Sequence, residues 1–247
     1  MTRPLFRDLR VRLAAQQYSD PAAQNRYDAS LAFAAVHRLR PHVIAFTEAG
    51  KGQNPEGQQR IGAQAERLGY DAFFDGYEGG IATRFGAVLD HGYLGPIIPG
   101  KAGDHPHIGL SWVLLRHSLY PDLAVGVTHW LNRDYEPARA RLNDAMSREI
   151  TNFLEEVAGP KGVPLLAGDT NRDDQHYDVL PGTGWTTAWD KLGVWPTTHG
   201  KNRTIDIWAH NDADTNVRVK SGRALPRGYS DHNRIDVTYS ISKKRTR

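Results

Sequence analysis

Short apolar runs, bounded by polar or turn-forming residues, recur along the chain and are typical of β-strands. Alternation of apolar with charged residues predicts a strand with one solvent-facing side, and an unbroken apolar run predicts a strand buried on both sides of a sheet. The strands expected from these patterns are Leu9–Gln17, His42–Thr47, Leu110–Arg116, Leu123–Trp130, Val163–Ala167, Thr204–Ala209 and Arg234–Ser240, with shorter ones at Asp71–Phe74 and Arg84–Leu89.

Apolar residues at steps of three and four predict helices between these strands. The helices expected are Asp20–Leu39, Gly57–Leu68 and Leu142–Val157, the last with Pro137 near its start. The short link between the strands at Leu110 and Leu123 predicts antiparallel neighbours. The segment Asn211–Tyr229 has no apolar pattern and is expected to be a long polar loop, which in a compact domain is functional or mobile.

In the stretch Val163–Asp174, V-P-L-L-A-G-D-T-N-R-D-D, a run of polar residues directly follows a predicted buried strand. Residues beyond the carboxyl edge of strands lie where α/β sheets place their ligands. Asp169 and Asn171 are two residues apart, so their side chains would point to the same face of the strand if the extended conformation continues past its end. A carboxylate and an amide there could hold and deprotonate a water, although an ordinary turn also fits this piece alone.

Other predicted strands also end in residues with catalytic capacity. They are Gln17, Glu48 and His129. The run Ser230-Asp231-His232 stands at the head of the last predicted strand, and Asp206 lies between two isoleucines inside a strand. A buried acid is costly unless it faces a partner. Each residue alone also fits a structural role, as a buried histidine, a loop carboxylate or a turn cap.

Composition favours a single globular domain spanning residues 1–247, with a frayed basic tail at 243–247. Hydrophobic residues make up 39% and charged residues 24% of the 247 positions. No apolar run approaches a membrane span and the amino terminus lacks a secretory signal, so a cytoplasmic location is expected. The absence of cysteine excludes disulfides and thiolate metal sites. The net charge of +3 and pI near 9.1 suit a polyanionic partner.

Taken in order, these motifs resemble the endonuclease/exonuclease/phosphatase family, which has a deoxyribonuclease I-like fold. The matching segments are A-A-Q-Q ending at Gln17, F-T-E at Glu48, T-H-W at His129, G-D-T-N at Asp169 and Asn171, I-D-I-W at Asp206, and S-D-H at Asp231 and His232. The resemblance implies an α/β fold, a four-layer α/β/β/α sandwich with two mixed β-sheets. The family has Asn where this chain has Gln17, whose amide reaches one methylene further.

The resemblance also implies metal-assisted hydrolysis of a phosphoester. Glu48, with Gln17 and Asp231, would hold Mg²⁺ or Mn²⁺ through oxygen. The expected catalytic set is Asp169 to orient or deprotonate water, Asn171 and His129 to bind phosphoryl oxygens, His232 to contact the scissile phosphate, and Asp206 to fix the tautomer of His232 and stabilise its protonated form.

Nucleic acid, DNA or RNA, is the substrate that the basic residues favour. These are Arg133, Arg139, Arg141, Lys201, Arg203 and the tail, while Trp130, Trp195 and Tyr229 could stack on bases or pack in the fold. One alternative is a phosphatase or phosphodiesterase acting on a phosphoinositide, a sphingolipid or a small phosphorylated metabolite. Another is a non-catalytic binding domain of the same fold, which the change at Gln17 supports. A monomer is favoured.

Overall fold

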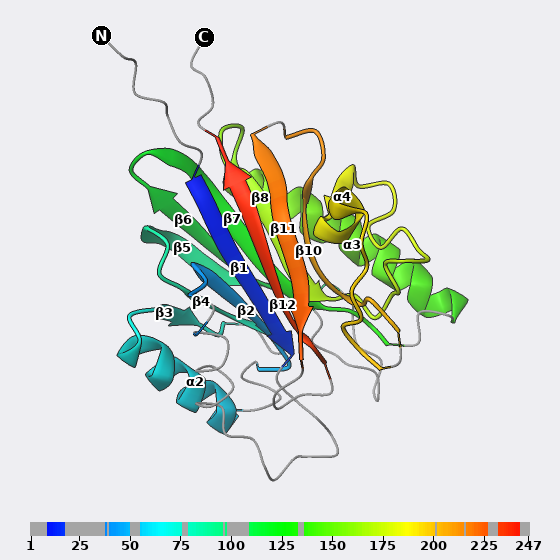
Figure 1. Ribbon diagram of the computed structural model, residues 1–247, viewed down its shortest axis with the longest axis horizontal. Helices are drawn as coiled ribbons and strands as arrows, with labels where there is room; N and C mark the ends of the chain where they lie inside the picture. Colours follow the sequence, from blue (N-terminus) through cyan, green and yellow to red (C-terminus); the bar gives the residue numbers. More distant parts are fainter. Residues whose placement is uncertain are drawn as a thin grey trace.

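Two six-stranded β-sheets face each other in the computed structural model (Figure 1). The structure describes residues 9–17, 38, 40–49, 55–75, 79–95, 97, 109–132, 136–200, 202–214, 216–226 and 232–242. The expected helix at Asp20–Leu39 therefore lies almost entirely outside the described residues. No helix in the described ranges is long and apolar enough to cross a membrane.

The first sheet has the strand order β11-β12-β1-β2-β4-β3. Its strands β1 and β2 are parallel and the other neighbours are antiparallel, so the sheet is mixed. The bounds are β1 Leu9–Gln17, β2 Val43–Thr47, β3 Asp71–Phe73, β4 Gly79–Thr83, β11 Val217–Leu225 and β12 Arg234–Ile241.

The second sheet has the order β5-β6-β7-β8-β10-β9, and here β7 and β8 form the parallel pair. Strands β6 and β7 are antiparallel neighbours, as predicted from their short link. The bounds are β5 Ala87–Leu94, β6 Leu110–His117, β7 Tyr120–His129, β8 Val163–Asp169, β9 Trp185–Thr187 and β10 Asp206–Asn211.

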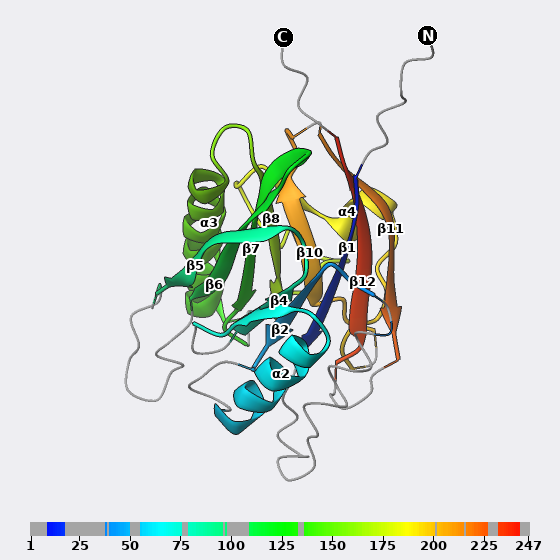
Figure 2. The same cartoon turned by 90° about the vertical axis from the view of Figure 1, so that its left-hand side faces the viewer.

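Helices cover the outer faces of the two sheets (Figure 2). Helix α2, Pro55–Arg67, packs through Ile61 on the apolar outer face of β2. Helix α3, Pro137–Ala158, packs on β7 and β8, where the Leu154 side chain lies against Gly126. The short helix α4, Ala188–Leu192, lies beside β9, β10 and β11. This arrangement confirms the predicted four-layer α/β/β/α sandwich.

Parallel neighbours bring functional strand ends to one edge. Gln17 at the end of β1 is the register partner of Thr47 at the end of β2, one residue before Glu48. The chain crosses from β7 to β8 through α3, so His129 and Asp169 end neighbouring strands. The backbones of Gln17 and Glu48 therefore lie at the same rim of the first sheet, and nothing is described of the Gln17 side chain.

The prediction of a long loop at Asn211–Tyr229 is wrong, because β11 lies within it and forms the edge of the first sheet. A register shift between Val219 and Ser221 breaks the alternation of apolar and polar residues that would have indicated a strand.

Strand β4 was not predicted either, and its glycines reflect close packing: a Cβ at Gly80 would lie 2.0 Å from the Phe74 ring. Strand β9 and helix α4 were also missed, and β5 begins and ends later than the predicted strand Arg84–Leu89.

Candidate active site

Three predicted site residues form one row across the second sheet. His129 at the end of β7 is the register partner of Asp169 at the end of β8, and Asp169 is the partner of Asp206 at the start of β10. Directly paired residues project their side chains from the same face of a sheet. Adjacent strands thus place an imidazole and two carboxylates side by side.

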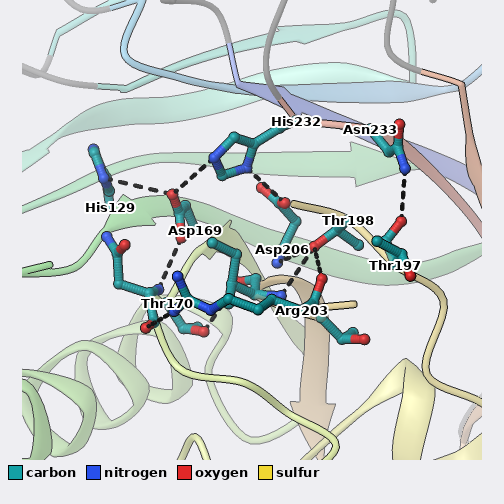
Figure 3. Close-up of polar contacts among 12 residues, drawn as sticks. His129, Asp169, Thr170, Thr197, Thr198, Arg203, Asp206, His232 and Asn233 are labelled. Carbon is teal, nitrogen blue, oxygen red and sulfur yellow. Dashed lines mark hydrogen bonds and ion pairs between the residues drawn. The ribbon is translucent and has the colours of Figure 1, made fainter. Parts of the chain in front are cut away.

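Two further residues approach this row from beside strands of the first sheet. Glu48 directly follows β2, and His232, labelled in Figure 3, lies two residues before β12. The Nδ1 atom of His232 lies 2.8 Å from Oδ2 of Asp206, which is a hydrogen bond, and its Nε2 lies 3.8 Å from Oδ2 of Asp169. The Nε2 atom of His129 lies 3.6 Å from the same Asp169 oxygen, and its Nδ1 lies 3.8 Å from Oε1 of Glu48. Five residues far apart in sequence therefore converge.

The centre of this group is buried. Asp169, His232 and Asp206 are 2%, 3% and 5% exposed. Burial raises the pKa of Asp169 above its ordinary value, although positive charge on His232 and His129 works in the opposite direction. A buried carboxylate between two imidazoles has the surroundings expected of a catalytic acid or base.

Glu48 and Asn171 have left-handed backbone conformations, with φ of 55° and 53°. A positive φ is uncommon for residues other than glycine and tends to occur at functional sites. At Glu48 the chain leaves β2 and turns at once, so the half-buried carboxylate stands at the strand end.

The extended conformation does not continue from Asp169 to Asn171. Instead, the backbone N–H of Asn171 donates to Oδ1 of Asp169 at 2.8 Å, which forms a tight turn and fixes the carboxylate. The Asn171 amide Nδ2 donates to the carbonyl oxygen of Trp130 at 2.9 Å. The Asn171 side chain thus links the loop after β8 to the residue that follows β7.

Sequence reasoning missed several residues that hold these loops in place. Asn143 of α3 accepts a hydrogen bond from the Leu131 N–H and donates to the Leu131 carbonyl oxygen, both at 3.1 Å. Arg172 is buried and donates to Asp144 at 2.7 Å. An Asn within a helix and an Arg in a loop give no sequence signal of such contacts, because both depend on how α3 packs.

Some expected participants do not reach the site or are not described. The idea that Trp130 stacks on bases is wrong, because the side chain is 1% exposed and belongs to the core. Arg203 does lie beside the site, because it is exposed and donates to the Asn171 carbonyl oxygen at 2.8 Å. Trp195 is 37% exposed. The residues outside the described ranges are Asp231, Ser230, Tyr229, Arg133, Lys201 and 243–247.

The donor set fits a hard divalent cation. Asp169, Asp206 and His232 offer ligand atoms within 4.8 Å of one another. The Nδ1 atom of His232 is hydrogen-bonded to Asp206, and the Glu48 carboxylate lies beside the same group, with Oε1 at 3.8 Å from Nδ1 of His129. Carboxylate oxygens suit Mg²⁺ or Mn²⁺.

No family model and no curated protein matches the chain. Solved structures do. A TDP2 from D. rerio humanized by 14 mutations has a TM-score of 0.73 and 20% identity, over 94% of this chain and 99% of that chain. TDP2 from D. rerio complexed with a single-strand DNA product has a TM-score of 0.71 and 18% identity, over 95% and 100%.

The endonuclease/exonuclease/phosphatase from Bacteroides vulgatus has a TM-score of 0.74 and 15% identity, over 95% of this chain and 100% of that chain. These similarities extend over nearly the whole length of both chains and include both sheets. The protein therefore has the deoxyribonuclease I-like fold of the endonuclease/exonuclease/phosphatase proteins.

Proposed function

We propose that this protein is a divalent-metal-dependent phosphodiesterase that hydrolyses the phosphodiester bonds of DNA or RNA. The observation that carries the proposal is the buried group formed by His129, Asp169, Asp206 and His232, in which both histidines direct Nε2 toward one oxygen of Asp169. Burying ionisable groups costs free energy of folding. Clusters of buried carboxylates and imidazoles are therefore typical of sites that bind ions or transfer protons.

Asp169 is the residue placed to activate water. Its Oδ1 is held by the Asn171 N–H, so Oδ2 is the oxygen that faces the two imidazoles. A water beside Oδ2 would transfer a proton to the carboxylate while the water oxygen forms a bond to phosphorus. The bond between phosphorus and the leaving ester oxygen would break in the same reaction.

His232 would stabilise the phosphoryl oxygens. Donation from Nδ1 to Asp206 fixes the orientation of the ring, and the carboxylate favours the doubly protonated imidazole. The Nε2–H of that imidazole could then donate to a phosphoryl oxygen as negative charge develops. His129, between Glu48 and Asp169, would donate to a second oxygen.

Glu48 would hold Mg²⁺ or Mn²⁺, with Asp231 and Gln17 as further ligands. The bound cation would supply neutralisation of phosphate charge. The half-buried carboxylate at the end of β2 supports this assignment, because it stands beside the row of His129 and Asp169.

Three observations support nucleic acid as the substrate. TDP2 from D. rerio, which shares the fold, was solved with a single-strand DNA product. The chain has a pI near 9.1, and Arg203 is an exposed cation next to Asn171. Cations at the rim of a site contact the phosphates that flank the reacting one.

Hydrolysis assays test the proposal directly. Plasmid, single-stranded DNA, RNA, phosphoinositide vesicles, sphingomyelin and bis-p-nitrophenyl phosphate are each incubated with Mg²⁺, Mn²⁺ or EDTA. We expect cleavage of a nucleic acid that EDTA abolishes and that weakens steeply with salt. Turnover of the lipids alone would identify the alternative phosphodiesterase, and binding without turnover of any substrate would identify a non-catalytic domain.

Variants test the assigned residues. Asp169→Asn and His232→Ala are expected to reduce kcat by at least ~10²-fold, the range for a general base and a charge-stabilising donor. His91→Ala is the matched control, because His91 forms an Asp–His pair with Asp75 at 2.6 Å on the exposed edge of the sheets. Full activity of Asp169→Asn would refute the assignment.

A further inference from the structure

In the part of the chain that the structure describes, no strand pairs with the start of β10 on the side of β9. Strand β8 pairs with β10 from Asp206 onward, but β9 pairs only with Ala209 to Asn211. The backbone at Ile205 and Asp206 is buried, so its N–H groups need other acceptors. Leaving a buried N–H group without an acceptor costs about 1–3 kcal/mol.

A single hydroxyl group meets this need. The Oγ1 atom of Thr198 accepts hydrogen bonds from the N–H groups of Ile205 at 2.9 Å and Asp206 at 3.1 Å. Thr198 is fully buried, and its own N–H donates to the Arg203 carbonyl oxygen at 2.8 Å. Thr198 therefore replaces the missing strand at the residue that carries the catalytic carboxylate (Figure 3).

The same residue holds the segment that carries His232. The carbonyl oxygen of Thr198 accepts a hydrogen bond from the Asn233 N–H at 2.6 Å. The next residue, His199, forms a β-bridge with His232, and their ring centroids lie 4.4 Å apart. Asp206 begins β10 of the second sheet and His232 lies just before β12 of the first sheet, and Thr198 contacts the backbone of Asp206 and of the residue after His232.

We propose that Thr198 is a positioning residue that holds Asp206 and His232 at hydrogen-bonding distance. Its hydroxyl group fixes the backbone of Asp206, and its carbonyl group fixes the backbone next to His232. The inference rests on the proposed function, because a fixed Asp206–His232 pair has a catalytic use only if His232 contacts the phosphate. A shift of about 1 Å in such a pair is enough to cost ~10²-fold in rate.

Substitutions of similar shape separate the hydroxyl group from the rest of the side chain. Thr198→Val keeps the volume but removes the acceptor, and Thr198→Ser keeps the acceptor. The matched control is Thr151→Val, because Thr151 is a buried threonine of α3 whose hydroxyl group donates to the Ser147 carbonyl oxygen, away from the site.

The expected kinetic result is a change in kcat rather than in KM. With the nucleic acid that the wild-type protein cleaves, Thr198→Val should lower kcat at least ~10-fold and change KM less than ~2-fold. Thr198→Ser and Thr151→Val should each keep kcat within ~3-fold of the wild-type value. A Thr198→Val protein that is folded and fully active, or a Thr198→Ser protein as impaired as Thr198→Val, would overturn the proposal.

Hydrogen exchange supplies a measurement that does not depend on turnover. Amide exchange at Ile205 and Asp206 should be at least ~10-fold faster in Thr198→Val than in Thr198→Ser, with Leu165 in β8 unchanged. Equal exchange in the two variants would also overturn the proposal. If Thr198→Val does not fold, Thr198→Ala is measured in the same way, with the same expected results.

A failure of this inference can be told apart from a failure of the proposed function. Absence of hydrolysis by the wild-type protein on every substrate would refute the function, while the exchange data would still test the contacts of Thr198. Hydrolysis by the wild-type protein together with unchanged kcat in Thr198→Val would refute the positioning role alone.

Discussion

Replacing Asp174 by Asn should stabilise the protein, and more so as the pH rises. Asp174 is 5% exposed, and its Oδ2 lies 2.7 Å from the hydroxyl oxygen of Thr187. The same hydroxyl oxygen of Thr187 also lies 3.0 Å from Oδ2 of Asp190. A hydroxyl group has one hydrogen, so it cannot donate to both carboxylates at once. A proton on Asp174 resolves the conflict, because Asp174 then donates to Thr187 and Thr187 donates to Asp190.

The magnitude follows from the pKa of Asp174. Burial, opposed by the Thr187 hydrogen bond and reinforced by the charges of Asp190, Asp173 and Asp178, raises this pKa from 3.8 to about 7. Between those values the unfolded chain is ionised and the folded one is protonated, so unfolding releases a proton and stability falls as the pH rises. At ~1.36 kcal/mol per pH unit, the loss is up to about 4 kcal/mol above pH 7.

Urea unfolding, followed by tryptophan fluorescence between pH 4 and pH 8.5, checks this prediction. Asn keeps the contact with Thr187 and cannot ionise, so the free energy of unfolding of Asp174→Asn minus that of the wild type should be near zero at pH 4. It should rise through pH 5–7 and level off above. Glu156→Gln, which changes an exposed acid of α3 that does not act on the pKa of Asp174, is the control. A difference independent of pH would refute the reasoning.

Two further changes test the packing that supports the site. Gly168→Ala would place a Cβ 2.2 Å from the carbonyl oxygen of Thr128 on the neighbouring strand. We therefore expect the free energy of unfolding, measured in urea, to fall by about 3 kcal/mol. Unchanged stability would contradict this close approach of the two backbones. Asn143→Leu removes both hydrogen bonds to Leu131 and should lower the free energy of unfolding by about 2–4 kcal/mol, measured in the same way; a loss below ~1 kcal/mol would contradict the importance of this contact.

The sequence predicted well those parts of the fold in which local pattern and tertiary role agree. The strand at Val163 has an unbroken apolar run and helix α3 has a regular apolar stripe, and both were found where expected. Strand β11 was missed because its bulge at Val219/Ser221 interrupts the alternation on which strand prediction depends.

The site shows the same division. Predicted strands that end in polar residues place His129 and Asp169 at one rim. Asp206 was expected inside a strand, whereas it begins β10, and the structure brings the three together. The roles of Thr198 and Asn143 could not be predicted, because each acts through backbone groups of a segment distant in sequence. At Asn171 the sequence fitted both a continued strand and a turn, and the structure has the turn.

The alignment of His129, Asp169 and Asp206 across three strands limits where residues can be inserted in this protein. Successive side chains of a strand point to opposite faces, so insertion of one residue within β7, β8 or β10 would turn a member of the row away from the others. Insertions in the connecting loops would leave that alternation intact. New substrate preferences should therefore be sought by grafting loops onto this scaffold, with the three strands kept at their present length.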